Sequence, residues 1–166
     1  MRMAPGDENI KGRVEIEMVG DPTDVVWIHA GDNLTITSAM FESNAARIER
    51  VSEDLVGLSF SLPLPHHPTL AITYEGKLPS KDGRGAYRQE EKGDWYIFTQ
   101  FESTDARRAF PCFDEPGFKT PFTLKLQVPE DQLAFANTPE VGSKKESGKD
   151  AGWKTVTFAP SQPLPT

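Results

Sequence analysis

The sequence predicts an all-β fold: a saddle-like sandwich of mostly antiparallel sheets with one short helical turn near residues 104–109. Apolar and polar residues alternate with period two in about nine short segments, as in strands with one buried face. The 13 Gly and 14 Pro residues are typical of short strands joined by turns. No window keeps a 3.6-residue period, so helices are not expected to contribute to the core.

The alternating segments define the expected strands in order. They cover residues 14–18, 25–29, 34–36, 46–51, 58–62, 70–74, 95–101, 122–128 and 153–158. The fourth segment contains a slip in its alternation, and the eighth alternates most clearly. Residues 80–93 and 142–152 are rich in Gly and charged side chains, so we expect both to be long, mobile hairpin loops.

The single helical candidate is short. Ser103 or Thr104 is suited to the N-cap, because a hydroxyl can accept a hydrogen bond from a free backbone N–H. Asp105 would then lie in the first turn, where the helix dipole favours a carboxylate. Pro111 is expected to stop the helix.

Composition excludes several classes of protein. With 18 basic and 25 acidic residues the net charge is -7, which disfavours a nucleic-acid partner. Cys112 is the single cysteine, so neither an internal disulfide nor a zinc cage of several cysteines is possible. No segment approaches the roughly 18 apolar residues of a membrane span, and residues 1–8 lack the apolar core of a secretory signal. The compartment stays open, with the cytoplasm favoured.

Residues 100–116 contain the densest mixture of charged and aromatic side chains. They are expected to run from a strand through the helical turn into a loop bounded by prolines, where binding residues are often held. Charges this close to apolar anchors need partners. We therefore expect a structural clamp in which Arg107 or Arg108 pairs with Asp114 or Glu115.

The stretch from Thr99 to Lys119, TQFESTDARRAFPCFDEPGFK, closely resembles the signature of the aminopeptidase N family of zinc metallopeptidases. Flanking segments agree in order: Gly12–Ile16, Tyr74–Leu78, Gly85–Arg88 and Ala136–Pro139. The resemblance therefore covers nearly the whole chain.

This resemblance implies a fold and two site residues. The fold would be the saddle-shaped β-domain that precedes a thermolysin-like catalytic domain, and residues 1–166 would be a fragment containing that N-terminal domain alone. Glu102 occupies the family position that binds the free α-ammonium of a peptide substrate. Gln100 occupies the position that lines the pocket for the first side chain. Period-two alternation would place Gln100 and Glu102 on one strand face and Phe101 on the other.

The resemblance also implies a zinc ion that this chain is not expected to bind. In the family the ligands come from His-Glu-x-x-His and a downstream Glu. The three histidines here, His29, His66 and His67, cannot form that motif. We expect no metal site and no catalytic residue in the fragment, which would be inactive alone. The full-length parent would be a zinc aminopeptidase, with this domain's partners being its own catalytic domain and a peptide with a free N-terminus.

Two other interpretations stay open. The chain could be a stand-alone β-sandwich binding module, or a domain of a relative whose zinc motif has decayed. In a fragment, the face around Phe101 and Phe110 would be exposed, and exposed apolar faces favour self-association. We also expect that the chain ends within or beside the last hairpin, and that its amino end is trimmed or short. The preferred first residue and the physiological oligomeric state are not predicted.

Overall fold

The computed structural model describes all residues, 1–166, and confirms the all-β fold. The strands are β1 Asn9–Glu17, β2 Thr23–His29, β3 Leu34–Phe41, β4 Asn44–Ala45, β5 Arg47–Arg50, β6 Leu55–Leu64, β7 Thr69–Lys77, β8 Gly85–Glu91, β9 Asp94–Gln100, β10 Lys125–Pro129, β11 Glu140–Lys145 and β12 Trp153–Phe158. Two 3₁₀ helices complete the structure, η1 Ala106–Arg108 and η2 Gly148–Asp150. Neither has the length or the apolar character needed to cross a membrane.

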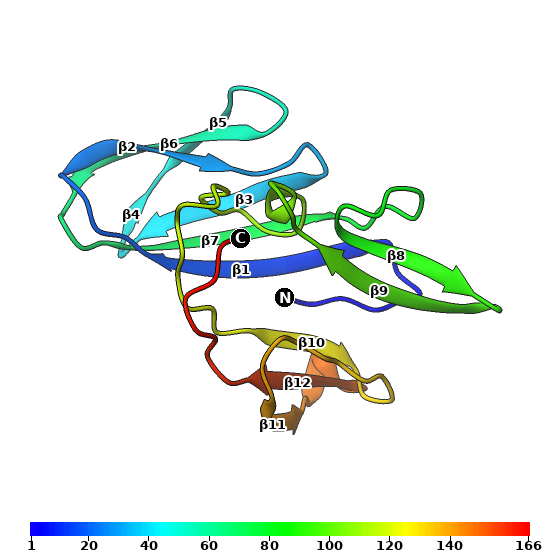
Figure 1. Cartoon of the computed structure of the whole chain (residues 1–166). Coiled ribbons are helices and arrows are strands. Elements are labelled where there is room, and N and C mark those ends of the chain that lie inside the picture. Colours follow the sequence, from blue (N-terminus) through cyan, green and yellow to red (C-terminus); the bar gives the residue numbers. More distant parts are fainter.

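Two antiparallel sheets pack face to face and enclose the first part of the core (Figure 1). One has the strand order β1-β7-β3-β4 and the other β2-β6-β5. Alternate residues of each strand point into the space between them. Ile28 and Leu58 from the second sheet and Leu70 and Ile72 from the first are fully buried there. The period-two pattern of the sequence therefore becomes a sandwich because each sheet has one apolar face.

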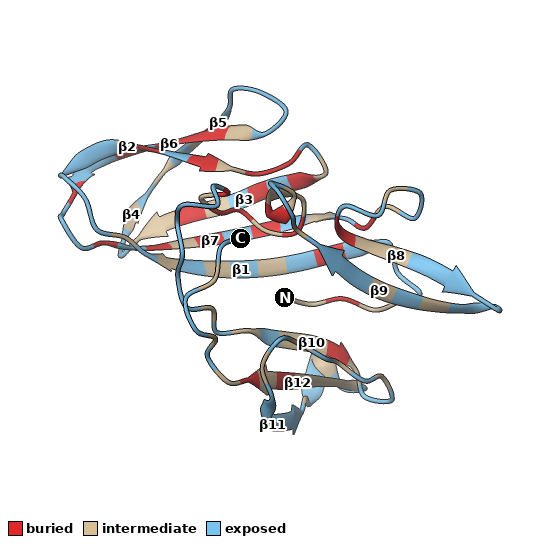
Figure 2. Cartoon of the chain, in the orientation of Figure 1, coloured by how far each residue is buried: buried red, intermediate tan, exposed pale blue.

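The other strands surround a second core cluster. A three-stranded sheet, β10-β12-β11, contributes Val128 and Val156, while the β8–β9 hairpin contributes Ala86. These side chains meet Ile10 and Tyr74 from the β1–β7 pair. Figure 2 shows buried segments concentrated in β2, β3, β6 and β7, whereas β11 and the outer part of the hairpin are exposed.

Two expected loops contain strands, so that part of the prediction was wrong. Residues 80–93 include β8, which pairs with β9, and β11 reaches from the preceding residues into 142–152. All six residues of β11 are exposed, and the last three of β8 are exposed too. Strands of this kind form because a neighbouring strand offers hydrogen bonds, and they need no apolar alternation.

The strand expected over residues 46–51 is present as β5, Arg47–Arg50, and a change of sheet precedes it. β4 pairs with β3, while β5 pairs with β6 in the opposite sheet. Ala46, between them, packs against the first core cluster. The chain therefore crosses from one layer to the other at Ala46, just before β5.

Two boundaries also differ from expectation. β10 begins at Lys125, because Phe122 binds the Ser161 side chain and backbone. At η1, Asp105 stands at the N-cap and makes no side-chain capping bond, so neither Ser103 nor Thr104 caps it. The position of η1 is instead determined by the tertiary contacts of the residues that come after it.

Candidate functional site

The β8–β9 hairpin leads directly into the segment that contains Gln100 and Glu102. Its register pairs Tyr87 with Phe98 and Gly85 with Gln100. Along β9, Trp95 and Ile97 are partly buried, while the other five residues are exposed. Gln100 is the last residue of the strand and lies on the exposed face. The buried face of β9 therefore fixes the strand, and the outer face presents Gln100.

Glu102 is the second residue after the end of β9. The Phe101 ring between the two candidates is half-buried and packs edge-on against Phe110, with 5.8 Å between ring centroids. Gln100 and Glu102 are both exposed. The carboxylate of Glu102 makes no ion pair within the chain. An exposed carboxylate at this point can accept hydrogen bonds from a cationic group.

A buried ion pair fixes the backbone behind these residues. Arg107 Nε donates to Asp114 Oδ2 over 2.9 Å, and the Arg107 backbone N–H reaches the same oxygen over 3.1 Å. The Asp114 side chain is fully buried. Asp54 adds a contact of 3.3 Å to Arg107. Burial alone would lower the pKa of Arg107, but the Asp114 hydrogen bond and the two carboxylate charges outweigh it and raise that pKa.

The remaining residues of the expected clamp lie apart from this pair. Arg108 pairs with Asp82, at 3.2 Å, in the connection before β8. Glu115 is exposed and forms no ion pair. Of the four candidates, the structure thus brings Arg107 and Asp114 together and leaves Arg108 and Glu115 outside.

Residues near β2 anchor the same segment from the other side of the fold. The His29 backbone exchanges hydrogen bonds with Cys112, both of 3.0 Å, and His29 Nδ1 accepts the Asp114 N–H over 3.2 Å. Asn33 Nδ2 donates to the Arg108 carbonyl over 2.8 Å. These partners are about 80 residues away in sequence, and no motif connects them, so sequence reasoning missed them.

The expected exposed face around Phe101 and Phe110 is not observed. Both rings are half-buried, and Phe110 also packs against Phe122 with a centroid separation of 6.3 Å. On the β8–β9 hairpin the exposed aromatic residues are Tyr96 and Phe98, stacked at 6.3 Å. The residues after the motif thus cover Phe110, because the chain turns back over it.

Cysteine and histidine side chains do not assemble a metal site. No group of three or more His, Cys, Asp or Glu residues lies close enough to hold a metal ion. Burial, reinforced by the Asp114 charge, raises the pKa of the Cys112 thiol, so the thiolate that binds metals is disfavoured. His66 and His67 are exposed in the turn before β7. The residues of this chain therefore do not fit a zinc ion.

Comparison with known proteins decides the family. All residues, 1–166, match the family described as Peptidase M1 N-terminal domain. The chain is a peptidase M1 N-terminal domain. It is 38% identical over 135 residues to aminopeptidase M1-D of Oryza sativa subsp. japonica, covering 76% of this chain and 15% of that protein.

Relatives of this M1 N-terminal domain occur in distant organisms. Bovine aminopeptidase N is 31% identical over 156 residues, which cover 83% of the chain and 16% of that protein. Human endoplasmic reticulum aminopeptidase 1 is 33% identical over 156 residues, which cover 80% and 16% respectively. The chain thus spans roughly a sixth of the length of each relative. The family resemblance of residues 99–119 is confirmed at the scale of the whole chain.

Proposed function

We propose that this chain is the substrate-recognition and scaffold domain of a zinc aminopeptidase that removes residues from the N-terminus of peptides. Residues 1–166 would form the N-terminal β-domain of that parent, with the thermolysin-like catalytic domain following in sequence. Alone, the domain would be inactive. Zinc would be held by the catalytic domain and would polarise the scissile carbonyl and activate water.

Glu102 would bind the free α-ammonium of the substrate. An ionised carboxylate facing an ammonium in a closed cleft forms a charge-assisted hydrogen bond and rejects peptides whose amine is blocked. Gln100 would line the pocket for the first side chain, since its amide offers both a donor and an acceptor. The chain would thereby supply one half of a site whose metal lies in the other domain.

The observation that carries this proposal is the division of the signature segment. Ala106, Ala109, Cys112 and Asp114 are buried within it, whereas Gln100 and Glu102 are exposed. The fold accounts for the buried residues. It gives Gln100 and Glu102 no partner within the domain, as expected for side chains that serve a neighbouring site.

Mutation of Glu102 in the full-length protein tests the assignment. Glu102→Ala should lower kcat/KM for aminoacyl amides by about two orders of magnitude, because a buried ammonium would lose its counter-charge. Glu115→Ala is the matched control, since it removes another exposed carboxylate of the same segment. Turnover of Glu102→Ala close to that of the unmodified protein would refute the amine-binding role.

Translation beyond Thr166 separates the leading proposal from a stand-alone binding module or a non-catalytic relative. The proposal expects Gly-x-Met-Glu-Asn followed by His-Glu-x-x-His. A reading frame without the zinc motif would favour the alternatives. A cytoplasmic location stays part of the proposal, to be tested by fractionating cells that express the full-length protein.

A further inference from the structure

The connection between β2 and β3 holds the short turn η1 that follows Glu102. The Gly31 backbone N–H donates to the Arg107 carbonyl over 2.7 Å, and Asn33 Nδ2 donates to the Arg108 carbonyl over 2.8 Å. Carbonyls at the end of a helical turn have no donor within the turn itself. Gly31 and Asn33 therefore supply the hydrogen bonds that η1 cannot make alone.

Asn33 also ties this turn to the four-stranded sheet. Its Nδ2 donates a second hydrogen bond, of 3.1 Å, to the Lys77 carbonyl at the end of β7. The Lys77 backbone N–H in turn donates to the Asn33 carbonyl over 3.1 Å. A side-chain amide has two N–H donors, and both are used here. The Asn33 side chain thus connects the end of β7 with the end of η1.

The loop that carries Asn33 is itself fixed by Arg50. The Arg50 guanidinium donates to three backbone carbonyls, those of Ala30 over 2.8 Å, Gly31 over 3.2 Å and Leu34 over 2.8 Å. A Cβ at Gly31 would lie 2.7 Å from Asn33 Oδ1, so glycine allows the loop to close on the amide. The Asn33 amide is therefore presented to η1 by a rigid support.

One hydrogen bond transmits the position of η1 to Glu102. The backbone N–H of Asp105, at the N-cap of η1, donates to the Phe101 carbonyl over 2.9 Å. That carbonyl belongs to the peptide group that joins Phe101 to Glu102. A displacement of η1 therefore displaces the backbone from which the Glu102 side chain projects.

A close contact transmits the same displacement to Gln100. Gly85 pairs with Gln100 across the β8–β9 hairpin. It also lies against η1, because a Cβ added at Gly85 would come within 2.4 Å of Arg108 Cβ. Arg108 is the residue whose carbonyl Asn33 holds. Both exposed candidates thus depend on the same turn, and the turn depends on Asn33.

We propose that Asn33 is a positioning residue for amine recognition: it holds η1 so that the Glu102 carboxylate meets the α-ammonium of the substrate. This inference rests on the proposed role of Glu102. Without the Asn33 donors, the Arg108 carbonyl loses its partner and η1 moves. A charge-assisted hydrogen bond needs its atoms at the correct distance and angle, so the moved carboxylate binds the ammonium more weakly.

Two inhibitors of the full-length protein measure the contribution of the amine. One is leucine hydroxamate, and the other is the same hydroxamate without its amino group. The ratio of their affinities isolates the interaction with the ammonium. Asn33→Ala should lower this ratio about tenfold, while the affinity for the amine-free compound changes by less than about twofold. Equal losses of affinity for both compounds would overturn the proposal, since they would mean general damage to the site.

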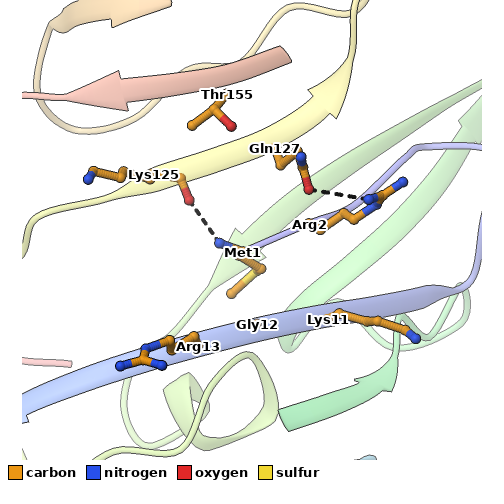
Figure 3. A pocket seen from close by; sticks show the side chains of 8 residues that line it. All are labelled: Met1, Arg2, Lys11, Gly12, Arg13, Lys125, Gln127 and Thr155. Atoms are coloured by element: carbon orange, nitrogen blue, oxygen red, sulfur yellow. Dashed lines mark hydrogen bonds between the residues drawn. The ribbon is translucent and has the colours of Figure 1, made fainter. Parts of the chain in front are cut away.

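Two amide side chains elsewhere in the fold provide matched controls. Asn44 is half-buried like Asn33, and its Nδ2 donates to the Leu62 carbonyl over 3.1 Å. Gln127 is half-buried in the hollow between β1 and β10, where its side chain accepts a hydrogen bond from Arg2 (Figure 3). Asn44→Ala and Gln127→Ala should keep the affinity ratio of the unmodified protein. A fall in these variants as large as in Asn33→Ala would overturn the proposal.

A double-mutant cycle determines whether Asn33 acts through Glu102. In the Glu102→Ala background, Asn33→Ala should change the affinity ratio by less than about twofold, because no carboxylate is left to position. Losses that add in the double variant would overturn this inference alone. An unchanged ratio in Glu102→Ala would refute the amine-binding role and this inference with it. Where Asn33→Ala does not fold, Asn33→Gln takes its place in the cycle, since it keeps the amide and displaces its donors by one methylene group.

Discussion

The two halves of the signature segment behave differently in this fold. Arg107 and the fully buried Asp114 form an ion pair, whereas Gln100 and Glu102 lie exposed at and just after the end of β9. Only residues 103–106 separate Glu102 from Arg107. A family signature thus combines residues that hold the backbone with residues that face outward, and resemblance alone does not separate them. The difference predicts that mutation lowers the unfolding free energy strongly at the buried residues and little at the exposed ones.

The largest effect is expected at Asp114. Replacing it with Ala leaves the largely buried Arg107 with only the exposed Asp54 as counter-charge. Breaking a buried pair in this way costs about 3–5 kcal/mol of unfolding free energy. Urea denaturation of the chain measures the loss. Glu115→Ala provides the reference, and a similar small change in both variants would contradict the distinction between buried and exposed halves.

Gly85→Ala should have the next largest effect. Gly85 has φ of +67° and pairs with Gln100, and an added Cβ would lie 2.4 Å from Arg108 Cβ. The left-handed backbone and the clash together are expected to cost about 2–3 kcal/mol. Thermal unfolding monitored by circular dichroism measures it. Gly93→Ala, also at positive φ but with open space around it, should cost less. An equal cost at both positions would rule out the clash as the cause.

A smaller effect concerns the dependence of stability on pH. Burial, and then the Arg107 charge, lowers the pKa of His29. The unfolded chain then binds more protons than the folded one in the window below the ordinary histidine pKa of about 6.5. The contribution of His29 is therefore complete above that value and is lost as pH falls through the lowered pKa.

His29→Asn keeps an acceptor for the Asp114 N–H and removes the titration. Its unfolding free energy should fall less steeply than that of the unmodified chain between about pH 7 and about pH 5. Denaturant titrations at several pH values give both slopes. Parallel slopes would show that His29 is not the group responsible.

The smallest effect is expected at the exposed half. Glu102→Ala and Gln100→Ala should each change the unfolding free energy by no more than about 0.5 kcal/mol, since both side chains lie at the surface without partners in the chain. The same denaturation assay decides it. A loss of unfolding free energy comparable with that of Asp114→Ala would mean that Gln100 and Glu102 stabilise the fold. The contrast between the buried and exposed halves of the segment would then be wrong.

Sequence reasoning succeeded where a local pattern carried the information. Strands such as β7 and β12 alternate apolar and polar residues, and the fold buries the apolar set. It failed for β11, whose residues are all exposed and which forms through pairing with β12. It also left Arg107 and Arg108 as equal candidates for the clamp. Asp82, which precedes both in the connection before β8, distinguishes the two by pairing with Arg108.

By itself, the sequence determined the fold class and the family. Period-two alternation and the segment from Thr99 to Lys119 are local and need no knowledge of distant contacts. Tertiary structure alone decided that His29 reaches Asp114 and that Arg2 bridges Lys11 and Gln127. Those contacts join residues more than 80 positions apart or link separate sheets. A hydrogen bond at such a separation depends on how the sheets pack, which no local pattern encodes.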